Sequence, residues 1–162
     1  MRFPPWLLTG FLGGVIGGII GYGIYRSAIG DGYEVLPVYA GIAAFACSSG
    51  FWWLILDRPQ KYTIRRGAIA GALAGTLSHY LCWYLIILGS NACYWITGGC
   101  TGSLGEVPVD PFQGLAAAFT YSLFSLFFYG WLTIPTGVVT SAILASAYRK
   151  YRAPGGGESR QD

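Results

Sequence analysis

The chain has 162 residues, of which 54% are hydrophobic and 10% charged, and its formal net charge is +3. Soluble domains carry about 25% charged residues, and a short chain has too much surface to cover with so few of them. The composition therefore excludes an ordinary water-soluble domain and indicates lipid as the solvent. The 25 glycines, six tryptophans and twelve tyrosines agree with this, because membrane helices are rich in glycine and carry aromatic belts at both interfaces.

Four long apolar stretches follow one another along the chain, at about residues 5–25, 36–56, 64–88 and 112–148. Apart from Arg65 and Arg66 at the start of the third, they contain no Asp, Glu, Lys or Arg. A hydrocarbon core of about 30 Å needs about 20 apolar residues in a helix, and each stretch is long enough. We therefore predict an all-α integral membrane protein in which residues 1–152 form a single domain, a bundle of four transmembrane helices. The tail at 153–162, rich in glycine and charge, is predicted to be disordered in the cytoplasm.

The basic residues predict the orientation of this bundle. Nine of the ten lie before the first stretch, between the second and third or at the very start of the third, or after the fourth, and only Arg26 lies on the other side. The positive-inside rule places those nine in the cytoplasm, so we predict cytoplasmic termini in a bacterial inner membrane. This basic surface would flank the helices and contact anionic lipid, or alternatively dock a cytosolic protein. It comprises Arg58, Lys61, Arg65, Arg66, Arg149, Lys150 and Arg152.

The fourth stretch is too long for one straight crossing, because about 36 helical residues span about 54 Å. It contains Pro135, and a proline inside a helix removes a hydrogen bond and bends the chain. We expect one long helix, kinked near Pro135, with Asp110 as its N-cap and Pro111 in its first turn. A re-entrant break at Pro135 is the alternative.

Glycines recur every four residues in the first and third stretches, so they lie on one face of each helix. Such faces let two backbones approach closely, and close packing drives helix association in lipid. We expect them to pack the first and third helices within one protomer. Alternatively, one face also meets a neighbouring subunit, since the first helix carries two glycine rows. The rows are Gly10, Gly14 and Gly18, then Gly13, Gly17 and Gly21, in the first helix, and Gly67, Gly71 and Gly75 in the third.

The segment 90–111 is predicted to be an external loop, because the charge rule places it in the oxidising periplasm. It holds Cys93 and Cys100, which we predict to form a disulfide. Two free thiols are the alternative, and a metal site has no His or third Cys nearby in the sequence. The residues 94–96 between the two cysteines would anchor this loop at the membrane interface or form a docking knob for a partner.

His79 is the single histidine of the chain and lies near the middle of the third stretch. Ser78 precedes it, and Thr120 and Tyr121 lie at comparable depth in the fourth stretch, so a polar cluster is predicted inside the membrane. The simpler interpretation is a neutral His79 bonded to a hydroxyl of a neighbouring helix, a bond that contributes about 0.6 kcal/mol. The alternative is a pH-sensitive switch or part of a polar pathway.

The sequence contains no Walker loop, dinucleotide fingerprint, zinc-protease motif or serine-hydrolase motif, and no known family is recognised in it. We predict that the protein is not an enzyme, takes no cofactor or metal and binds no nucleic acid. The leading hypothesis is a small membrane subunit that oligomerises or docks through its glycine faces and scaffolds or anchors a larger membrane assembly. The alternatives are a membrane sensor with a cytosolic effector partner, of bacterial stress or phage-defence type, and a small oligomeric channel or carrier.

Overall fold

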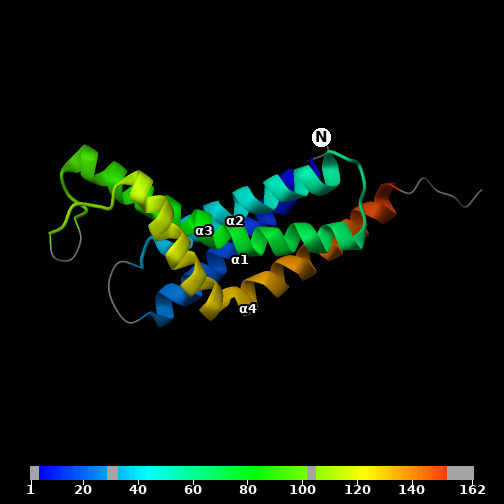
Figure 1. Ribbon diagram of the computed structural model, residues 1–162. Helices are drawn as coiled ribbons and strands as arrows, with labels where there is room; N and C mark the ends of the chain where they lie inside the picture. The colour runs from blue at the N-terminus through cyan, green and yellow to red at the C-terminus, as the bar shows by residue number, and fades with distance from the viewer. Residues whose placement is uncertain (1–3, 29–32, 102–104, 153–162) are drawn as a thin grey trace, which may run out of the picture.

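The computed structural model describes residues 4–28, 33–101 and 105–152 (Figure 1). Helix α1 spans Pro5–Ser27, α2 spans Leu36–Trp52 and continues into the π-helical turn η1 at Trp53–Asp57, α3 spans Ile64–Thr97 and α4 spans Pro111–Arg152. These described ranges contain no strand. The four helices, with α2 and η1 taken together, are long and apolar enough to cross a membrane. The predicted all-α chain with four potential membrane spans is thereby confirmed, while the prediction for the tail at 153–162 lies outside the described residues.

Local side-chain chemistry starts the helices. The Thr63 side chain caps α3 by accepting a hydrogen bond from the backbone N–H of Arg66 at 3.3 Å. The Asp110 carboxylate accepts from the backbone N–H of Phe112 at 2.9 Å, just before Pro111 opens α4. Each cap satisfies a backbone N–H group that the first turn of a helix leaves without a partner.

Helix α3 is longer than the sequence analysis predicted, since it ends at Thr97 and not near residue 88. Polar residues follow Leu88, but their side chains bond to carbonyl oxygens of the preceding turn. Ser90 donates to Ile86 at 3.0 Å, and the side-chain amide of Asn91 donates to Ile87 at 2.9 Å. The helix stops only at Gly98, whose positive φ of 69° is favourable for glycine. Residues 94–96 therefore lie on the helix and not in the loop.

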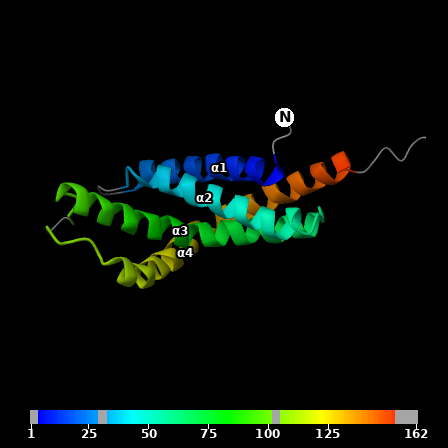
Figure 2. The same cartoon turned by 90° about the horizontal axis from the view of Figure 1, so that it is seen from above.

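The four helices form two hairpins that lie side by side. Helix α1 packs along α2, α3 packs along α4, and α2 joins the two hairpins by packing against α3. Figure 2 shows α2 between α1 and α3. Helix α4 touches α1 only locally, and within the described ranges α1 and α3 do not pack against each other.

Most of the outer surface is apolar. On α4, Phe112 is 84% exposed, Phe127 80% and Trp131 73%. A water-soluble monomer rarely exposes a large contiguous apolar patch, whereas the lipid tails around a membrane helix are as apolar as these side chains. The surface thus agrees with a membrane-embedded bundle. The largest fully buried side chains, Trp52 and Leu56, lie at the end of the first hairpin.

Candidate functional site

The glycine rows of α1 lie against α2. A Cβ atom added to Gly17 would come within 2.8 Å of the carbonyl oxygen of Ala40, and one added to Gly14 within 3.2 Å of that of Gly41. The nearest neighbours of all six glycines belong to α2: Gly10, Gly13, Gly14, Gly17, Gly18 and Gly21. Both rows therefore pack against α2 within the chain.

The glycine row of α3 lies against α4 in the same way. A Cβ added to Gly67 would come within 2.6 Å of the carbonyl oxygen of Ser141, and one added to Gly75 within 2.9 Å of that of Thr133. Gly71 faces Gly137. The expectation that the glycine faces pack the first helix against the third is therefore wrong. Glycine spacing identifies the face of a helix that packs closely, but it does not identify the neighbour, and here each glycine helix closes its own hairpin.

His79 on α3 is buried and bonds to two hydroxyl groups of α4. Its Nδ1 lies 2.7 Å from Oγ of Ser125, and its Nε2 lies 2.8 Å from Oγ1 of Thr133. Ser125, Tyr129 and Thr133 are four residues apart and so share one face of α4. The structure thus gives His79 the kind of partner that the simpler interpretation expected, a hydroxyl of a neighbouring helix.

One arrangement of these hydrogen bonds uses the second partner of Thr133. Its hydroxyl lies 3.2 Å from the carbonyl oxygen of Tyr129, and a hydroxyl that donates its one proton there accepts from His79. In this arrangement Nε2 of a neutral His79 carries the ring proton, and Nδ1 accepts the hydroxyl proton of Ser125. We call this chain from Ser125 through His79 and Thr133 to the Tyr129 carbonyl the histidine relay. It satisfies both ring nitrogens.

A cavity of about 540 Å³ opens beside the histidine relay, and residues of all four helices line it. A smaller cavity of about 70 Å³ continues from it along the boundary between the hairpins, towards Ser48 and Ser141. The two cavities share part of their walls, namely Gly17, Ile20, Ala44, Ser78 and Thr133. Polar side chains, among them His79, Ser78, Thr133, Ser48 and Ser141, therefore line one seam between the two hairpins.

The structure brings together only part of the polar cluster that the sequence predicted. Ser78 lines both cavities, and its hydroxyl donates to the carbonyl oxygen of Gly75 at 3.3 Å. Tyr121 lines the larger cavity. Thr120 lines neither, because it is exposed on α4 and donates to Ala116 at 3.1 Å. Thr133 was missed, although its spacing of eight residues from Ser125 placed both hydroxyls on one helix face.

Asp57, at the end of η1, is a second site that the sequence analysis missed. It is 8% exposed, and its carboxylate accepts three hydrogen bonds. The donors are the backbone N–H of Trp6 at 3.2 Å, the indole N–H of Trp52 at 3.2 Å and the hydroxyl of Tyr62 at 2.8 Å. We call this group the Asp57 node. In the sequence Asp57 resembles an ordinary flanking charge, and the one signal is that it is the only acid in the basic segment 57–66.

The Asp57 node holds three segments of the chain at one end of the bundle. Trp6 opens α1, Tyr62 lies in the connection from η1 to α3, and its ring lies 6.1 Å from that of Tyr148 near the end of α4. Exposed cations surround this end: Arg58, Lys61, Arg65, Arg149 and Lys150. Arg66 is partly buried, and its guanidinium donates to the carbonyl oxygen of Ile55 at 3.1 Å, while Arg152 is the last residue of α4.

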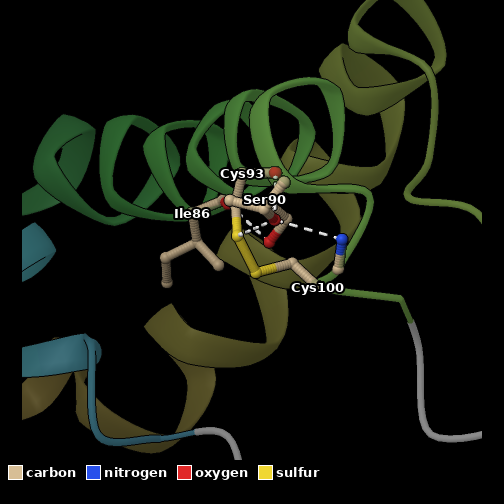
Figure 3. Close-up of a disulfide and its surroundings, with 6 residues drawn as sticks. Ile86, Ser90, Cys93 and Cys100 are labelled. Carbon is tan, nitrogen blue, oxygen red and sulfur yellow. Dashed lines mark hydrogen bonds between the residues drawn. A yellow bond between two sulfur atoms is a disulfide. The ribbon is translucent and has the colours of Figure 1, made fainter.

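At the opposite end, Cys93 and Cys100 join across the end of α3. Their sulfur atoms lie at disulfide-bonding distance, with the Cα atoms 6.0 Å apart, as predicted. Figure 3 shows the bridge beside Ser90 and Ile86 of α3. The chain turns back at Gly98 to bring Cys100 to Cys93, so the bridge fixes the first residues after the helix. Trp95 and Ile96 stay exposed, at 68% and 82%.

The chain was compared with protein-family models, curated proteins and solved structures. No protein-family model, no curated protein and no solved structure matches it. The site geometry must therefore carry any functional assignment.

Proposed function

We propose that the protein is a small, non-catalytic subunit of a bacterial inner membrane that anchors a larger assembly through its basic end. Both termini would lie in the cytoplasm, and the four helices would hold the subunit in the bilayer. The observation that carries this proposal is the convergence of exposed cations from two distant segments. Arg58 and Lys61 come from the connection before α3, Arg65 from the first turn of α3, and Arg149 and Lys150 from the end of α4.

The Asp57 node supports this proposal because it would keep the basic surface in one shape. A carboxylate with three hydrogen-bond donors is well satisfied despite its burial. Its donors tie α1 to the connection between η1 and α3, and the ring contact of Tyr62 with Tyr148 adds α4. Cations held in a fixed arrangement favour an acidic protein surface over random contact with solvent ions, since complementary charge determines specificity and association rate.

The surface proposed to bind the partner differs from the glycine faces expected from the sequence. The glycine rows close the two hairpins of a single chain, so a partner would meet the basic end and not a glycine face.

A bend at Pro135 also belongs to this proposal. Proline lacks the N–H that an unbroken helix needs there, and Pro135 lies well inside α4. Such a bend would let the end of α4 reach the segment around Tyr62.

Photo-crosslinking in native membranes tests the proposal. A benzophenone amino acid at exposed Pro59, in the basic connection, should form a defined protein adduct, and one at exposed Val107, at the opposite end, should not. Changing Lys61, Arg149 and Lys150 together to Gln should remove the adduct, whereas Arg26→Gln should leave it. Arg58, Arg65, Arg66 and Arg152 remain in the triple variant and preserve the charge bias that orients the chain. Equal adducts from both positions, or an adduct that survives neutralisation, would count against a docking role.

A further inference from the structure

We propose that the larger cavity between the two hairpins binds a flat, neutral, carbonyl-bearing ring compound with an apolar tail, of the benzoquinone class. This inference is independent of the anchoring role, because it concerns the interior of the bundle and not its basic end. The cavity measures about 540 Å³. Sites for small molecules and cofactors span about 300–1,000 Å³ and are mostly apolar with a few placed polar groups.

The described lining disfavours a charged ligand. No Asp, Glu, Lys or Arg is among the residues that form the cavity wall in the described part of the chain. An ion transferred from water into this space would lose its hydration without gaining a counter-ion, at a cost that membrane interiors rarely bear. A phosphate head group or an ammonium group is therefore disfavoured, and a neutral molecule fits.

Aromatic side chains give the cavity flat walls. Trp83 on α3 and Tyr121 on α4 lie with their ring centroids 5.2 Å apart, and Phe124, Phe128 and Tyr129 continue the wall along α4. Rings of this kind stack on, or meet edge to face with, a planar ligand ring. The wall therefore favours a ring compound over a simple alkyl chain.

The polar atoms on the wall favour a ligand that accepts hydrogen bonds. The hydroxyls of Tyr121 and Tyr129 and the indole N–H of Trp83 have no hydrogen-bond partner among the described residues, and all three residues line the cavity. The ring nitrogens of His79 are both occupied within the histidine relay. The two phenol hydroxyls can each donate a hydrogen bond and the indole N–H can only donate, so the wall can bind ligand carbonyl oxygens.

One side of the cavity is open to the surroundings of the bundle. Tyr121 is 49% exposed, and Phe124 and Phe128 are each 60% exposed although they line the cavity. In a bilayer that side would face lipid, so a ligand would enter from the membrane and leave its tail among the acyl chains. An apolar tail follows from this position.

Binding of decyl-substituted benzoquinone to the full-length protein in lipid nanodiscs tests the assignment. We expect saturable binding of one molecule per chain, beyond the partitioning into empty nanodiscs. Changing Tyr121 and Tyr129 together to Phe should weaken it by roughly five- to 150-fold, the loss expected for two hydrogen bonds. The matched control changes Tyr80 and Tyr84 to Phe, because these two stacked tyrosines of α3 lie outside the cavity, and it should bind like the wild type.

Decylbenzene, which lacks carbonyl groups, serves as the comparison ligand and should not displace the quinone. An azido-benzoquinone should label residues 78–83 or 121–133, which locates the site without relying on a variant. Absence of saturable binding, displacement by decylbenzene at equal concentration, unchanged affinity of the Tyr121 and Tyr129 variant, or labelling confined to other segments would each overturn the assignment.

Discussion

Gly71 and Gly137 lie back to back across the interface between α3 and α4. A Cβ atom on Gly137 would come within 2.6 Å of the carbonyl oxygen of Gly71, so only glycine fits without moving a backbone. We expect Gly71→Ala and Gly137→Ala each to lower the free energy of unfolding by about 1–3 kcal/mol, the usual cost of overpacking. Unfolding by sodium dodecyl sulfate in mixed micelles measures this directly.

The control is Gly23→Ala, because apart from the local backbone of α1 and the adjacent residues no atom lies within 4 Å of a Cβ at that position. Alanine favours the helix there, and stability should stay equal or rise by about 0.5–1 kcal/mol. If the substitutions at Gly71 and Gly23 shifted stability in the same direction, close backbone contact would not be the reason for the glycine row.

The histidine relay predicts the tautomer of His79. Because the chain has one histidine, its two ring nitrogens give the only imidazole signals in a ¹⁵N spectrum of the protein in bilayers. At neutral pH we expect Nε2 to carry the proton and Nδ1 to be bare. Thr133→Val should shift the Nε2 signal by removing its acceptor, while Thr120→Val, on the exposed side of α4, should leave both signals in place. A proton on Nδ1 would contradict the relay.

Loss of the Asp57 carboxylate should loosen the basic end. In Asp57→Asn an amide N–H₂ would face one of three donors, which leaves a buried donor without an acceptor. We expect a loss of about 1–3 kcal/mol in the free energy of unfolding. Asp110→Asn is the matched control, since asparagine caps a helix about as well as aspartate. Equal effects of the two substitutions would mean that the Asp57 node does not stabilise this end.

The bridge between Cys93 and Cys100 should stabilise the outer end of α3. A disulfide across a sequence separation of seven restricts the unfolded chain and contributes about 2–3 kcal/mol in the chain-entropy model. Changing both cysteines to Ser should lower the free energy of unfolding by that amount, and reductant should have no further effect on the double variant. If reductant changed neither the stability nor the gel mobility of the wild-type protein, no such bridge would form.

The sequence predicts the spans well because charge avoidance is a strong constraint in lipid, and α2 and α3 begin at Leu36 and Ile64, where the apolar stretches begin. It predicts the end of α3 poorly, because Ser90 and Asn91 look like loop residues until their bonds to the preceding turn are known. The helix that packs against each glycine row could not be predicted from the spacing, because the spacing describes only the face of the helix that carries it.

The Asp57 node shows the same limit of sequence reasoning. One of its three donors lies 51 residues from Asp57 in the sequence, and no local sequence pattern predicts such a contact. Ser125 and Thr133 were closer to prediction, since their spacing already placed them on one face of α4. What the sequence lacked was the position of His79 opposite that face.

All that we propose for the basic end depends on the compartment that it faces. Labelling of the single-site variants Lys61→Cys and Glu106→Cys with an impermeant maleimide measures this most directly, because the native cysteines lie within the helices or are paired. In intact cells with a permeable outer membrane, Cys at position 106 should react at once. Cys at position 61 should react only after the inner membrane is opened. Immediate labelling at position 61 with protection at position 106 would contradict the account.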